Sequence, residues 1–138
     1  MTQVLTKIMI HAPADVIWQV VSDLGAACQY LPGVVNCTVE GEGVGALRTL
    51  INADGSTIVE RLEALDEITH RLSYVLLTDT PFRDCVTTVT VHELDGGRCE
   101  VTWSAVFQSD GLPANEAREM LEDALATNCL ALKQVFER

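Results

Sequence analysis

This sequence has few aromatic side chains and no long hydrophobic run. Phe, Trp and Tyr make up 5% of its 138 residues, although hydrophobic residues together make up 48%. That composition predicts an aliphatic core in a single domain spanning residues 1–138. No apolar stretch approaches the ~20 residues of a membrane span, and residues 1–4 lack the basic head of a signal peptide. We therefore expect a cytoplasmic protein with no membrane insertion.

Basic residues are also scarce. There are 9 Lys and Arg against 20 Asp and Glu, so the formal net charge is −11. Nucleic acids and anionic membrane surfaces are bound through basic patches, and we expect neither as a partner. The sequence does not determine the oligomeric state, and a homodimer stays open.

Motifs for metals and disulfides are missing as well. The odd number of cysteines and the absence of a Cys-x-x-Cys spacing argue against a disulfide framework or a zinc site. We expect buried free thiols, no metal and no cofactor. The residues concerned are scattered along the chain: Cys28, Cys37, Cys85, Cys99 and Cys129, with His11, His70 and His92.

The chain does contain one long amphipathic stretch, from Leu112 to Arg138. Pro113 suits the first turn of a helix, and Lys133 lies near the other end, where the helix dipole favours positive charge. One side of this helix is apolar and the other is mostly charged. The apolar side carries Leu121, Leu125, Leu132 and Phe136, with Ala117, Ala124 and Asn128. A single helix cannot bury such a stripe alone, so a curved sheet must wrap around it.

Most of the preceding chain has the pattern of strands. Two short helices, over residues 13–23 and 24–30, follow the first strand. Turn signals at Asp54-Gly55 and Asp95-Gly96-Gly97 indicate antiparallel hairpins. The expected fold is α+β, with about seven strands at residues 4–10, 34–39, 47–52, 57–65, 70–78, 84–94 and 98–108.

The last hairpin allows a register prediction. A three-residue loop at residues 95–97 separates an apolar inner face from a polar outer face, and a one-residue slip would destroy this separation. Trp103 then faces inward. The predicted inner pairs are Val91 with Val101, Val89 with Trp103, Thr87 with Ala105, and Cys85 with Phe107.

The same reasoning places Arg48 opposite Glu60 in the hairpin that turns at Asp54-Gly55. Their face of the sheet also carries Leu50, Ile58 and Leu62. One interpretation is a semi-exposed ion pair worth ~0–1 kcal/mol. The other is a charged pair at the floor or mouth of a cavity, where Arg48 anchors a carboxylate or enolate and Glu60 acts as an acceptor or base.

The order of elements resembles the START-like, or helix-grip (SRPBCC), superfamily, and most closely its bacterial polyketide cyclase/dehydrase-like and lipid-transport-like members. The matching segments are residues 13–18 with 22–23, 31–34, 45–50 followed by Gly55, 60–62 with 65–66, 71–74 and 101–104. The resemblance implies a sheet gripping the final helix, with a cavity for a hydrophobic small molecule between them. It turns Ser104 into the cavity, whereas the register turns Trp103 inward. By position in the family, the cavity is lined by Glu60, Tyr74, Leu76, Cys85, Thr87, Leu121, Leu125 and Cys129, to which the register adds Arg48 and Trp103.

Three functions remain open. The first is binding of a polyketide-, lipid- or aromatic-like molecule in an apolar cavity. The second is a cyclase or dehydratase, with Glu60 or Tyr74 transferring protons and Arg48 stabilising negative charge. The third is a ligand-free interaction subunit whose cavity is plugged by Trp103, Phe107, Met120 and Phe136. A cavity well below ~300 Å³ would favour the third function.

Overall fold

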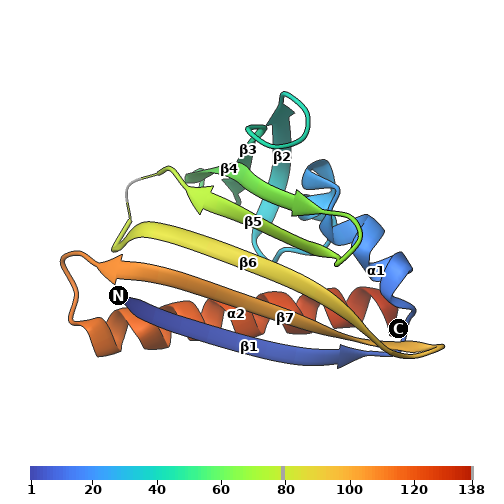
Figure 1. The fold of residues 1–138 in the computed structure, drawn as a ribbon. Coiled ribbons are helices and arrows are strands. Elements are labelled where there is room, and N and C mark those ends of the chain that lie inside the picture. Colours follow the sequence, from blue (N-terminus) through green and yellow to red (C-terminus); the bar gives the residue numbers. More distant parts are fainter. Residues whose placement is uncertain (79, 138) are drawn as a thin grey trace.

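A curved seven-stranded antiparallel sheet grips one long helix (Figure 1). The structure is a computed structural model that describes residues 1–78 and 80–137. The strand order is β1-β7-β6-β5-β4-β3-β2, as expected for a helix-grip α+β fold. The strands are β1 (Thr2–Ile10), β2 (Val34–Glu40), β3 (Leu47–Asn52), β4 (Thr57–Asp66), β5 (Arg71–Leu76), β6 (Phe82–Asp95) and β7 (Arg98–Ser109).

Three helices complete the described part of the fold: α1 (Ala14–Val21), the 3-10 helix η1 (Leu24–Gln29) and α2 (Ala114–Phe136). Pro113 has an extended backbone, with φ −55° and ψ 144°. The long helix therefore begins after this proline and not at Leu112. The predicted end of that helix, Arg138, lies outside the described residues. None of the described helices combines the length and the apolar character that crossing a membrane requires.

The long helix packs against one half of the sheet. α2 runs along β1 and β7 and touches both strands (Figure 1). Ala117, Leu125, Cys129 and Leu132 are its buried residues. The core is therefore densest between α2 and this half of the sheet, while the strands beyond it curve away from the helix.

A second contact fixes α1 against the turn between β4 and β5. The rings of Trp18 and His70 stack with centroids 5.2 Å apart. The Trp18 indole Nε1 donates a hydrogen bond to Glu67 Oε2 at 2.6 Å, and the Ala14 backbone N–H donates to Glu93 Oε2 at 2.7 Å. Together these contacts join the first helix to one end of the sheet.

The predicted register of the last hairpin is confirmed for three of its inner pairs: Val91 with Val101, Val89 with Trp103, and Thr87 with Ala105. The fourth prediction, Cys85 opposite Phe107, is wrong. The register shifts between Arg83 and Val86, where β6 contains one extra residue and Asp84 has a φ of 54°. This bulge ends the alignment, although Cys85 and Phe107 are both still buried.

Candidate ligand-binding site

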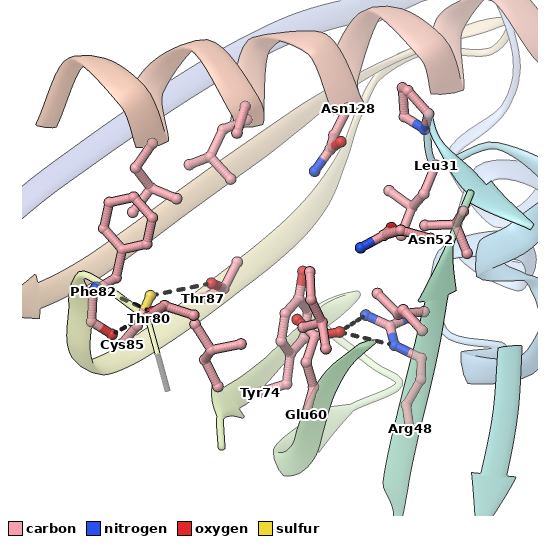
Figure 2. Close-up of a pocket in the computed structure, with 18 residues that line it drawn as sticks. Leu31, Arg48, Asn52, Glu60, Tyr74, Thr80, Phe82, Cys85, Thr87 and Asn128 are labelled. Carbon is pink, nitrogen blue, oxygen red and sulfur yellow. Dashed lines mark hydrogen bonds and ion pairs between the residues drawn. The ribbon is translucent and has the colours of Figure 1, made fainter. Parts of the chain in front are cut away.

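A pocket of about 290 Å³ lies between α2 and the inner face of β3 to β6 (Figure 2). This volume is at the lower end of the ~300–1,000 Å³ found for small-molecule sites. Most of the wall is apolar, and it is formed by Leu31, Pro32, Val34, Leu50, Ile58, Leu76, Phe82, Leu121, Ala124 and Leu125.

An ion pair forms the floor of the pocket. Arg48 on β3 and Glu60 on β4 are direct cross-strand partners, as predicted. Arg48 Nε and Nη2 both donate to Glu60 Oε1, at 3.0 and 2.6 Å. The two residues are only 4% and 9% exposed, so this pair is buried and not semi-exposed. Burial is the largest single influence on the pKa of Arg48 and lowers it, but the charge and hydrogen bond of Glu60, with Tyr74 and Tyr30, together outweigh burial and raise the pKa.

Tyr74 on β5 packs over this ion pair. Its ring centroid lies 5.0 Å from Arg48 Cζ, which is a cation–π contact. Burial is the main cause that raises the pKa of Tyr74; Glu60 raises it further and Arg48 partly offsets the shift. The indole N–H of Trp103 lies near the phenol and also lowers this pKa, but it makes no hydrogen bond within the described residues. The Tyr74 hydroxyl therefore keeps its proton at neutral pH and can donate it to a ligand.

Two amide side chains face the pocket from opposite walls, Asn52 on β3 and Asn128 on α2 (Figure 2). Asn52 Nδ2 donates to Ser56 Oγ at 3.1 Å. The Asn128 amide makes no hydrogen bond with any residue that the structure describes. Neither residue was among the site residues expected from the sequence. A signal for Asn128 was present, because an amide interrupts the apolar stripe between Leu125 and Leu132.

Cys85 and Thr87 on β6 lie toward the other end of the pocket. The Cys85 Sγ and Thr87 Oγ1 atoms are 3.9 Å apart. Burial raises the pKa of the Cys85 thiol, which keeps it protonated at neutral pH. This cysteine therefore contributes a soft apolar surface and lacks the thiolate that a nucleophile needs.

The structure brings most of the predicted site residues together on the pocket wall: Arg48, Glu60, Tyr74, Leu76, Cys85, Thr87, Leu121 and Leu125. Trp103 and Cys129 lie in the core and not on the wall. They are on β7 and α2, which contact each other. Trp103 is nevertheless buried on the inner face, as the register predicted, and its neighbour Ser104 lies on the opposite face. Within residues 1–78 and 80–137, no three His, Cys, Asp or Glu side chains are grouped so that they could hold a metal ion.

Comparison with known families places this pocket in context. The family model described as polyketide cyclase / dehydrase and lipid transport matches residues 1–137. The chain belongs to this family. A comparison with curated proteins finds no match.

Solved structures show the same fold as this polyketide cyclase/dehydrase family member. Protein XoxI from Bacillus cereus has a TM-score of 0.90 at 25% identity, covering 99% of this chain and 96% of that one. The Zhui aromatase/cyclase from a Streptomyces species has a TM-score of 0.77 at 24% identity, covering 99% and 94%. Norcoclaurine synthase from Thalictrum flavum, in complex with a transition-state analogue, has a TM-score of 0.77 at 19% identity, covering 98% and 93%. The identities to these two enzymes are low, so they show the fold alone.

Proposed function

We propose that the protein binds a small, mostly apolar molecule, of polyketide-, lipid- or aromatic-like character, in the pocket between α2 and the sheet. The observation that carries this proposal is an open pocket with apolar walls and a buried polar cluster, Arg48, Glu60 and Tyr74, at its floor. Ligand sites have this composition, in which apolar walls supply affinity and a few polar groups fix orientation. Membership of the polyketide cyclase/dehydrase and lipid transport family supports the same proposal.

The residues expected to plug the pocket are elsewhere. Trp103 and Phe107 are packed in the core, and Met120 is 50% exposed on α2. None of these three lines the pocket, and Phe136 does not line it either. None of the four residues fills the pocket, which supports ligand binding. It argues against a ligand-free interaction subunit whose cavity is plugged.

Protein purified from its own source allows a direct test. Native mass spectrometry of the purified protein should reveal a copurified small molecule, which would identify the ligand class. A titration with 2-naphthol, followed by calorimetry, provides a second measurement with a defined probe.

Two tryptophan substitutions on α2 make the titration specific to the pocket. Ala124 lines the pocket on its open side, whereas Ala126 on the same helix is exposed and is not on the wall. We expect Ala124→Trp to weaken 2-naphthol binding by about tenfold or more, a loss of ~1.4 kcal/mol, and Ala126→Trp to leave it unchanged. Equal affinities in both variants would overturn the proposed binding site.

A cyclase or dehydratase is the second candidate. Arg48 contacts only Oε1 of Glu60, so Oε2 makes no hydrogen bond with a described residue and could accept a proton from a substrate. Tyr74 could protonate a departing hydroxyl, and Arg48 could stabilise an enolate. Together these groups would remove water from a β-hydroxy ketone and leave an enone.

This second candidate is tested with 4-hydroxy-4-phenylbutan-2-one, whose dehydration product absorbs in the near ultraviolet. A dehydratase would convert this probe, and Glu60→Gln and Tyr74→Phe would abolish conversion, whereas 2-naphthol binding would weaken but persist. If the wild-type protein binds 2-naphthol but does not accelerate the dehydration, binding alone is the better account of the site.

A further inference from the structure

We infer that the pocket selects ligands that carry no net charge, such as phenols and ketones, over carboxylates and amines of the same size. This inference rests on the proposed function above and specifies the class of molecule that the pocket accepts.

The first observation is the charge of the pocket itself. Among the described residues that line it, only Arg48 and Glu60 are charged. Arg48 Nη2 and Glu60 Oε1 lie 2.6 Å apart, so their charges compensate each other. The remaining polar groups of the wall, including Tyr74, Asn52 and Asn128, are uncharged at neutral pH. The pocket therefore offers polar groups to a ligand but carries no net charge that a charged ligand would neutralise.

A charged ligand would upset this balance. A carboxylate bound to Arg48 would place a second negative charge beside Glu60 in a largely apolar space, where like charges repel strongly. An ammonium group bound to Glu60 would meet the guanidinium of Arg48 in the same way. Either ligand would leave one buried charge without a partner, which is strongly unfavourable. The net charge of −11 on the whole chain adds a further, salt-dependent repulsion against anions.

The hydrogen-bonding groups that remain fit a neutral ligand. Arg48 donates to Glu60 through Nε and Nη2, and the buried Tyr30 side chain also lies beside the guanidinium, while Nη1 donates no hydrogen bond to Glu60. Arg48 Nη1 and the Tyr74 hydroxyl can donate to a ligand carbonyl or phenol oxygen. Glu60 Oε2 can accept from a ligand hydroxyl, and Asn128 can do either. An apolar skeleton bearing hydroxyl and carbonyl oxygens satisfies these groups without adding charge.

Three probes of nearly equal size test the inference: 2-naphthol, 2-naphthoate and 2-naphthylmethylammonium. Their affinities for the wild-type protein are measured by calorimetry at neutral pH and at physiological salt. We expect 2-naphthol to bind about tenfold or more tightly than either ion. The inference is overturned if either ion binds as tightly as 2-naphthol or more tightly.

Substitutions in the ion pair should reorder the probes. Glu60→Gln leaves the charge of Arg48 uncompensated and should make 2-naphthoate the tightest ligand. Arg48→Gln leaves Glu60 uncompensated and should favour the ammonium probe. The double variant is again neutral and should restore the preference for 2-naphthol, and circular dichroism checks that each variant is folded.

Glu63→Gln provides the matched control. Glu63 is on the same strand as Glu60, and its side chain is exposed and paired with Arg61. The substitution removes one negative charge from the protein without touching the pocket, so the ranking of the probes should not change. A ranking that moves toward 2-naphthoate in this control would show that overall charge, and not the pocket, selects the ligand, and would overturn the inference.

The two proposals can fail separately. Binding of none of the three probes overturns the proposed function together with this inference. Binding in which a charged probe ranks first leaves the proposed function standing and overturns only the charge selection. If the single variants do not fold, the wild-type ranking and the double variant still decide the outcome.

Discussion

Arg48 and Glu60 meet across β3 and β4 in a position that solvent hardly reaches, with two guanidinium nitrogens on a single carboxylate oxygen. Removing two charges from water is unfavourable, and their attraction often only restores what desolvation has lost. A buried pair of this kind is therefore weak evidence of stabilisation. Under the proposed function, its position at the pocket floor gives the pair a use in ligand binding.

The first prediction separates these roles by stability measurements. Arg48→Met should lower the free energy of unfolding by ~3–5 kcal/mol, because it leaves Glu60 buried without a partner. The double variant Arg48→Met/Glu60→Leu should recover most of that loss, since no buried charge remains. Urea unfolding curves of the three proteins provide the measurement. A double variant as unstable as the single one would contradict this account of the pair.

The exposed pair Arg61–Glu63 is the control for this prediction. Arg61 Nε and Glu63 Oε1 are 2.6 Å apart, as close as the buried pair, but both side chains are exposed. Arg61→Met should therefore change the free energy of unfolding by no more than ~1 kcal/mol. Because the two ion pairs have the same contact distance, the difference between the two stability losses reports the effect of burial.

The second prediction concerns Asn128. Asn128→Leu should raise the free energy of unfolding by roughly 0.5–1 kcal/mol, because it completes the apolar stripe of α2 and adds buried apolar area. The same change should weaken 2-naphthol binding, since it removes an amide from the wall. Thr127→Leu, at the exposed neighbouring position, is the control for helix propensity. Equal stabilisation by both substitutions would show that propensity alone explains the effect.

The third prediction concerns the contact between α1 and the β4–β5 turn. Trp18→Phe retains an aromatic ring against His70 but removes the hydrogen bond to Glu67. Hydrogen bonds to charged groups contribute ~1.5–3 kcal/mol, and partial exposure of this one suggests a loss of ~1–2 kcal/mol. Thermal unfolding followed by circular dichroism measures the loss, and Glu67→Gln should reproduce only part of it. An unchanged melting temperature in Trp18→Phe would show that the hydrogen bond contributes nothing.

The fourth prediction is loss of stability at alkaline pH. Burial raises the pKa of the Cys99 thiol from about 9 to about 11, with a smaller contribution from Glu93. Burial raises the pKa of Cys129 in the same way, to about 11. At a pH between the unfolded and the folded pKa values of these thiols, the unfolded chain releases the thiol protons that the folded protein retains. The free energy of unfolding should therefore be unaffected below pH ~9 and fall by up to ~2–3 kcal/mol per thiol as the pH rises through ~11.

Urea midpoints on both sides of this pH range measure the effect, and Cys99→Ala/Cys129→Ala is the comparison. The double variant has no buried thiols at these two positions, so its stability should decline less steeply than that of the wild type. Identical declines would assign the alkaline loss to other groups.

Much of the fold could be predicted because local patterns and global packing agree in this chain. The pairing of Val89 with Trp103 follows from a turn signal and an alternating pattern, and both are visible in the sequence. The bulge at Asp84 is not visible there, because it depends on one residue adopting a positive φ, which an aspartate tolerates without requiring it. The failed pairing of Cys85 with Phe107 is the result.

The face of the sheet on which the pocket lies could be predicted from the alternation of residues. Which inward-facing residues reach the pocket could not, because that depends on where α2 lies. The strand pattern and register place Arg48 and Glu60 on the inner face, whereas Tyr74 is expected there from the family resemblance. Cys129 shares the inward face of α2, yet it lies in the core because the helix rests on β1 and β7 and stands away from the other strands. Where a helix lies across a sheet depends on packing between distant segments, and the alternation of residues does not encode it.

The pairing of β1 with β7 has a consequence for the order of events during synthesis. β1 is made before the other elements, but the strand it pairs with among the described residues is β7, and the helix that covers it follows still later. A growing chain therefore carries an unpartnered strand until nearly all other elements have emerged. The hairpins from β2 to β6 can form as they appear, whereas the β1–β7 end of the sheet and the α2 wall of the pocket are completed together in one late step.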